Sequence, residues 1–177
     1  MTAERDGEPA EGQAFVCRML FAHGVDFVLI GGVAMTLHGL RHLTDDLDIL
    51  YRATPDNIAR LGQALETLGA HARNNPVLRF DAAVDLGELA TWEGNLFDTP
   101  YGRLDCFRDA PGVRSYDLLR RHAEAHPLAE SHVLAASLTD LIAMKRAAGR
   151  EKDLAVLPEL RRLHRERTQA RHTRRTR

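Results

Sequence analysis

The chain has 177 residues, of which 44% are hydrophobic and 28% charged, with a formal net charge of −1 and two cysteines. This composition excludes a disulfide-rich secreted module and a disordered chain. No apolar run is long enough to span a membrane. The length suits one domain. Residues 1–12 are acidic and polar, so we expect a disordered N-terminus. They lack the pattern of a signal peptide, so we expect a cytoplasmic protein whose two thiols are reduced.

The first elements predict a strand that ends at a glycine pair. An amphipathic helix is predicted over residues 13–23, and the apolar run over residues 27–30 predicts a strand. That run stops at Gly31 and Gly32, and residues 33–40 have helical character. Adjacent glycines let the backbone approach a ligand closely, and the free N–H groups at a helix start favour an anion such as triphosphate.

A pair of carboxylates follows on the next predicted strand, over residues 46–51. Asp46 and Asp48 are separated by one residue, so the strand period places both on one face, while Leu47 and Ile49 face the core. Close like charges repel each other, and a bound Mg²⁺ or Mn²⁺ would relieve that repulsion. The alternative is a solvent-facing acidic strand or an Asp-rich turn.

The middle of the chain supplies a candidate for a third carboxylate. A helix from Pro55 to Leu68, a strand near residues 77–80 and a hairpin over residues 92–107 are predicted here. Asp105 lies within the returning strand of the hairpin, where Asp is uncommon. It either faces Asp46 and Asp48 or lies on an exposed strand face.

The last part of the chain predicts a helix over residues 115–124, a strand over residues 131–135, and two closing helices, residues 138–148 and 151–167. The fold class is therefore α/β, of the α+β type, with a mixed sheet flanked by helices. The domain is expected to cover residues 13–167. Residues 168–177 are basic and predict a flexible tail that contacts nucleic acid, although a merely solvated terminus is an equal alternative.

A charged cluster lies where the two closing helices meet. A continuous helix would bring Lys145 and Asp153 to one face, whereas a helix that ends at Gly149 would let them converge across a turn. Lys145 flanks the apolar stripe of its helix, which favours a lysine that contacts phosphate and an Asp153 that either orients this lysine or acts as a base toward an acceptor hydroxyl. The alternative is a solvated charged face. The histidines, including His38 and His42, are interpreted as core or capping residues.

The joint pattern resembles the polymerase-β-type nucleotidyltransferase superfamily, and within it the minimal, abortive-infection (AbiEii-like) group. The resemblance rests on Gly31-Gly32, Gly39, Thr44, Asp46-Leu47-Asp48 and Asp105, and on the helical block of residues 138–154, and it runs from about Gly24 to Leu160. Two departures are present. Gly32 stands where many members have Ser, and Arg41 lies one position before His42, which stands at the usual basic position.

The resemblance implies a nucleotidyltransferase-like fold and transfer of a nucleoside monophosphate from an NTP to an acceptor hydroxyl of RNA, protein or a small molecule. It implies metal ligands Asp46, Asp48 and Asp105, nucleotide-binding residues Gly31, Gly32, Thr44, Lys145 and Arg150, and catalytic residues Asp46, Asp48, Asp105, Lys145 and Asp153. The cofactor would be Mg²⁺ or Mn²⁺, and a cognate antitoxin or toxin is an expected partner. The alternative is a catalytically degenerate nucleotide-binding or protein-interaction module of the same fold.

Overall fold

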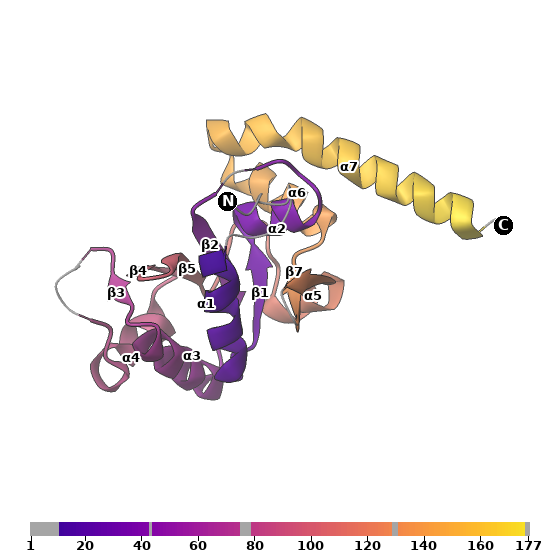
Figure 1. Ribbon diagram of the computed structural model, residues 1–177. Coiled ribbons are helices and arrows are strands. Elements are labelled where there is room, and N and C mark those ends of the chain that lie inside the picture. The colour runs from indigo at the N-terminus through magenta and orange to yellow at the C-terminus, as the bar shows by residue number, and fades with distance from the viewer. Residues whose placement is uncertain (1–10, 43, 75–78, 129–130, 176–177) are drawn as a thin grey trace, which may run out of the picture.

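The structure is a computed structural model that describes residues 11–42, 44–74, 79–128 and 131–175. Within these residues, helices and strands follow one another along the chain (Figure 1). The helices are α1 (Glu11–Ala22), α2 (Gly31–Leu37), α3 (Pro55–Thr67), α4 (Ala82–Thr91), α5 (Tyr116–His122), α6 (Leu138–Ala148) and α7 (Glu151–Arg175). The strands are β1 (Phe27–Ile30), β2 (Asp46–Tyr51), β3 (His71–Ala72), β4 (Gly94–Thr99), β5 (Gly102–Phe107), β6 (Glu124–Leu128) and β7 (Ser131–Ala135).

All seven strands of the described chain form one mixed sheet in the order β3-β4-β5-β2-β1-β7-β6. The pairs β2 with β5 and β1 with β7 are parallel, and the other neighbours are antiparallel. The predicted mixed α/β architecture is therefore confirmed. Strand β1 lies inside the sheet between β2 and β7 and is buried at every position, as its apolar sequence requires.

Two pairs of helices lie at opposite ends of the molecule. In Figure 1, α3 and α4 lie at one end, and α6 and α7 lie at the other. Helix α2 contacts β1, β2 and α6, so it connects the sheet to the closing helices. Helix α7 packs on α6 and buries Leu157 and Leu160, which are one helical turn apart.

Most predicted elements are confirmed, with small shifts at their ends. Strands β1 and β2 and helix α6 have the predicted bounds, and the hairpin consists of β4 and β5. Helix α2 begins at Gly31, two residues before the predicted start. Of the strand expected near residues 77–80, residues 77 and 78 lie outside the described chain, whereas Arg79 forms only an isolated bridge with His71.

Three elements were not predicted: α4, β3 and β6. Strand β6 contains Pro127, which argues against a strand from sequence alone. The sheet tolerates this proline because β6 is an edge strand, where one row of backbone N–H groups needs no partner strand. Strand β3 has two residues, too few for a periodic pattern.

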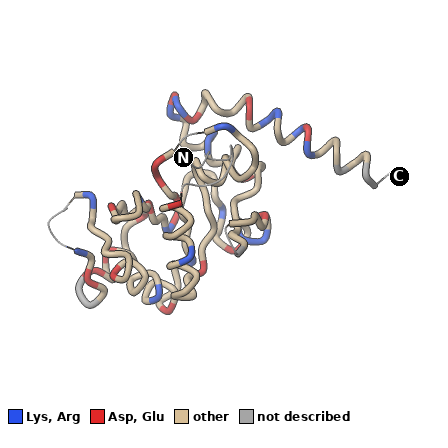
Figure 2. Tube along the Cα trace, viewed as in Figure 1, with Lys and Arg blue, Asp and Glu red and all other residues tan. Residues whose placement is uncertain are grey.

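The last helix is longer than predicted. We expected it to end at about Arg167, but α7 continues to Arg175, through most of the segment assigned to a basic tail. Its last part extends beyond the rest of the molecule (Figure 1). Residues 168–175 include three arginines, and Arg favours helix. The ion pair between Arg162 and Glu166 stabilises the turn of the helix just before this segment. Figure 2 shows the Lys and Arg residues of the helix in blue and its Glu and Asp residues in red.

Both cysteines, Cys17 and Cys106, are buried and unpaired with each other. Across the described residues, every helix is too short or too polar to cross a membrane.

Candidate active site

The turn at Gly31 and Gly32 holds the carboxylate of Asp48 in contact with the backbone. Gly31 has a φ of 64°, in the left-handed region that favours glycine, and a Cβ there would overlap the carboxylate of Asp48. The backbone N–H of Gly32 donates a hydrogen bond to that carboxylate. The strand end, the turn and the start of α2 therefore hold Asp48 against the backbone.

The parallel pairing of β2 and β5 brings the three aspartates together. In this register Asp48 pairs with Asp105, and Asp46 lies two positions before Asp48 on the same face of the sheet. Leu47 and Ile49 face the opposite way and are fully buried. Asp105 is only 8% exposed, which rules out the alternative of an exposed strand face.

This arrangement concentrates uncompensated negative charge. Burial, and after it the charges of Asp105 and Asp46, raise the pKa of Asp48 to about 7, against the opposing effects of the Gly32 N–H and of Lys145. Burial also raises the pKa of Asp105, although the Arg73 guanidinium opposes that rise. Asp48 and Asp105 are therefore poorly stabilised as anions by the protein alone.

The side chains at this face fit a hard divalent cation. Oδ1 of Asp46 is buried and accepts no hydrogen bond from the described residues. The nearest recorded cation, Nη1 of Arg103, is 3.6 Å from that oxygen, which is beyond hydrogen-bonding distance. An unsatisfied carboxylate oxygen beside two further carboxylates is a donor set that suits Mg²⁺ or Mn²⁺.

Two arginines that were not singled out in the sequence also lie at this face. Nη2 of Arg73 is 2.8 Å from Oδ1 of Asp105, and its Nε is 3.5 Å from Oδ1 of Asp98. Nε of Arg103 is 3.7 Å from the same Asp98 oxygen. Arg103 could have been found, since it precedes Asp105 by two residues on one strand. No sequence pattern places Arg73 near Asp105, because the position of Arg73 depends on the pairing of β3 with β4.

Thr44 packs closely on Gly32. A Cβ at Gly32 would lie 2.7 Å from the Cβ of Thr44, so a larger residue there would require Thr44 to shift. Oγ1 of Thr44 lies 3.3 Å from the backbone N of Asp46 and accepts a hydrogen bond from it. Thr44 therefore shapes the entry to β2 while it packs on the glycine turn.

The charged cluster at the closing helices converges across a turn. Gly149 ends α6 in the left-handed conformation, with a φ of 64°, and donates its N–H to the carbonyl of Lys145. Nζ of Lys145 is then 2.7 Å from Oδ1 of Asp153, while Nε of Arg150 donates to Oδ2 of the same carboxylate. The helix end at Gly149 excludes one continuous helix. The full burial of Asp153 excludes a solvated charged face.

The two parts of the candidate site influence each other electrostatically. Burial alone would raise the pKa of Asp153, but hydrogen bonds from Arg150 and Lys145 outweigh burial and lower it. Lys145 lowers the pKa of Asp48, and the charge of Asp48 contributes to the raised pKa of Arg150. Lys145 and Arg150 therefore face the carboxylates from the side of α6 and α7, and folding brings all the predicted site residues to one region.

No known family matches the sequence, and no curated protein matches it. Several solved structures are similar to the chain, of which three follow. One is the antibiotic-resistance factor ANT(2'')-Ia in solution, with a TM-score of 0.46 at 15% identity over 91% of this chain and 97% of that one. The same factor in complex with adenylyl-2''-tobramycin has a TM-score of 0.44 at 16% identity over 86% of this chain and 98% of the other. A putative nucleotidyltransferase from Thermotoga maritima has a TM-score of 0.49 at 12% identity, over 95% of this chain and 97% of its own.

Proposed function

We propose that this protein transfers a nucleoside monophosphate from an NTP to an acceptor hydroxyl. The observation that carries the proposal is the convergence of Asp46, Asp48 and Asp105 on one face of β2 and β5, with Asp48 held against the turn at Gly31. The carboxylates of this face lack enough partners within the protein, which supports a role in binding a cation.

In this proposal, Asp46, Asp48 and Asp105 hold Mg²⁺ or Mn²⁺. When bound, the cation would neutralise phosphate charge and favour in-line displacement of pyrophosphate. The carboxylate of Asp105 would accept the proton of the acceptor hydroxyl as that oxygen attacks the α-phosphorus.

Lys145 and Arg150 would contact the triphosphate. Asp153 holds both side chains, and a buried anion that fixes two cations reduces the entropy lost when they bind phosphate. Gly31, Gly32 and Thr44 would orient the nucleotide mainly by fixing Asp48 and the entry to β2, because the N–H of Gly32 already donates to Asp48. Lys145 is a partly exposed cation, so it can reach a ligand without leaving Asp153.

The test is transfer from each α-labelled NTP, with Mg²⁺ or Mn²⁺, to RNA, to protein and to small polyols or aminoglycosides. Labelled product should form with one acceptor class and should fall about 100-fold or more in Asp46→Asn and in Asp48→Asn. Asp56→Asn is the matched control, since Asp56 is exposed at the start of α3, and it should retain activity. Full transfer by the double variant of Asp46 and Asp48 would refute the assignment.

Thermal melts combined with this transfer assay distinguish an active enzyme from a catalytically degenerate module. That module would still be stabilised by Mg²⁺ with NTP in thermal melts, by mass action, yet would label no acceptor. A role in a toxin–antitoxin or phage-defence pair adds a further prediction. Expression of the wild type should then slow cell growth, Asp48→Asn should not, and the cognate protein should restore growth.

A further inference from the structure

A second group of metal-type ligands lies away from the three aspartates. His38 directly follows α2, and Glu124 and His126 lie two residues apart on β6, so that both face the same side of the sheet. The ligand atoms of these three residues lie within 4.8 Å of one another. We call this group the His38–Glu124–His126 cluster.

Each imidazole of the cluster can offer one ring nitrogen as an electron-pair donor. Nε2 of His38 lies 2.8 Å from the carbonyl of Ala136. A carbonyl only accepts, so Nε2 carries the proton and Nδ1 keeps its lone pair. A backbone carbonyl that fixes the imidazole in this way is the usual arrangement behind a metal-binding histidine. His126 adds a buried Nε2 that has no hydrogen-bond partner among the described residues.

A cation already lies within the cluster. Nη1 of Arg167, from α7, is 2.8 Å from Nδ1 of His38 and 3.2 Å from Oε2 of Glu124. Nη2 of the same guanidinium donates to the carbonyl of His38 at 3.1 Å. The fold has thus built a site for positive charge, and the guanidinium satisfies His38 and Glu124 but not Nε2 of His126.

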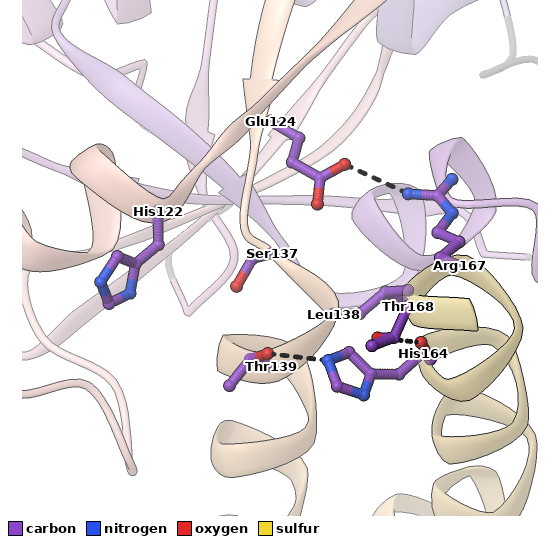
Figure 3. A pocket seen from close by; sticks show the side chains of 8 residues that line it. All are labelled: His122, Glu124, Ser137, Leu138, Thr139, His164, Arg167 and Thr168. Carbon is purple, nitrogen blue, oxygen red and sulfur yellow. Dashed lines mark hydrogen bonds and ion pairs between the residues drawn. The ribbon is translucent and has the colours of Figure 1, made fainter. Parts of the chain in front are cut away.

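The cluster adjoins a cavity of about 230 Å³, whose lining includes Glu124, Arg167 and His164 (Figure 3). In Figure 3, Glu124 and Arg167 extend toward each other from β6 and α7. The cavity provides room for the Arg167 side chain to move aside and for water to complete the coordination of an ion. An ion of the zinc class needs bonds of about 2.1 Å, so only modest side-chain shifts are required.

We propose that His38, Glu124 and His126 bind a transition-metal ion of the zinc class, and that Arg167 takes the place of the ion when metal is absent. Two imidazoles and one carboxylate form a ligand set that such ions prefer over Mg²⁺. Metal binding would displace Arg167 and release its contacts between α7 and His38. The site is separate from the proposed nucleotidyl transfer and does not depend on it.

The test is a titration of metal-free full-length protein with Co²⁺ and with Zn²⁺, with excess Mg²⁺ present to occupy the three aspartates. Co²⁺ should give the visible absorption bands of a four- or five-coordinate nitrogen and oxygen site, and Zn²⁺ should displace it at one ion per chain. Both His126→Gln and Glu124→Gln should lose binding by about 100-fold. The control His164→Gln changes a cavity residue outside the cluster, and its affinity should equal that of the wild type.

The variant Arg167→Met tests whether the guanidinium and the metal ion compete for the cluster. If the guanidinium competes with the ion, this variant should melt at a lower temperature without metal but should bind Zn²⁺ about tenfold more tightly than the wild type. If Arg167 is only a structural contact, the variant melts lower and gains no affinity, which overturns the proposal. Absence of Co²⁺ bands in both the wild type and folded Arg167→Met, or bands that survive His126→Gln, would also overturn it.

Discussion

Asp48 shows how a single residue links the fold to the candidate chemistry. Its carboxylate fills the space above Gly31, accepts the N–H of Gly32 and lies beside Asp105 across the β2–β5 pair. Burial and neighbouring carboxylates disfavour its charged form. The protein therefore holds Asp48 in a position that costs stability unless a proton or a cation neutralises it.

This balance predicts a pH dependence of stability. Because the folded-state pKa of Asp48 is about 7, above the ordinary value of 3.8, the stability that it contributes is complete below pH 3.8 and is lost as the pH rises through 7. In urea unfolding with a chelator present, the free energy of unfolding should fall between pH 5 and pH 8. Asp48→Asn should remove about 1–3 kcal/mol of that fall. Parallel pH profiles for the wild type and the variant would contradict the raised pKa.

A substitution at Gly31 tests whether its contact with Asp48 positions that carboxylate. Gly31→Ala should lose about 1–3 kcal/mol of stability from its left-handed backbone and should also displace Asp48, so thermal stabilisation by Mg²⁺ with NTP should disappear. Gly69→Ala is the matched control, because Gly69 has a φ of 62° and open space where the Cβ would lie. It should lose stability through the backbone alone and keep the response to ligand. Equal responses in both variants would show that the contact with Asp48 is unimportant.

At the scale of elements, the turn between α6 and α7 determines where the cations lie. Gly149 ends α6, and the first turn of α7 then presents Asp153 to Lys145 and Arg150. Asp153 is fully buried, whereas Arg150 remains largely exposed. A buried anion with two partners is costly to leave unpaired, which gives the turn a structural role in addition to the proposed one.

Single variants of Lys145 and Asp153 separate these roles. Lys145→Met should weaken NTP binding about tenfold or more, because a phosphate contact is lost. Asp153→Asn should lower the free energy of unfolding by about 1–3 kcal/mol and weaken NTP binding less than Lys145→Met does. Lys152→Met is the control, since Lys152 is an exposed residue on the same helix. A loss of stability without any change in NTP binding would leave only the structural role.

At the scale of the whole molecule, α7 connects distant parts of the chain. Its first turn contributes Asp153 to the candidate active site, its middle packs on α6, and Arg167 contacts His38 and Glu124. Beyond these contacts, the helix extends past the body of the protein (Figure 1). Residues 171–177 include four arginines, a density of charge that would attract the phosphates of an RNA acceptor.

If the acceptor is RNA, replacing the four arginines of residues 171–177 by Gln should weaken RNA binding without changing NTP binding. The slope of log affinity against log salt should decrease by about 1–3, because fewer counterions are released. The double variant Arg114→Gln/Arg121→Gln removes exposed charge elsewhere, and its slope should match that of the wild type. An unchanged slope in the fourfold variant, or no RNA binding by either protein, would remove this support for an RNA acceptor.

The sequence by itself determined the local part of this protein. The strand β1, the glycine turn, α2 and β2 lie within one short stretch, and the alternation of Asp46 and Asp48 with Leu47 and Ile49 fixes which face is acidic. The helix end at Gly149 follows from the ability of glycine to adopt a positive φ. Such features depend on neighbouring residues only, so their patterns are visible in the chain.

Only the tertiary structure decided which distant residues meet. The parallel register of β2 and β5 brought Asp105 to Asp48, and the pairing of the short strand β3 placed Arg73 beside Asp105. No local pattern encodes these pairings, because they depend on which strand edges remain free once the sheet assembles. The cluster of His38, Glu124 and His126, closed by Arg167, arises for the same reason: its members become neighbours only when β6 and α7 pack against the end of α2.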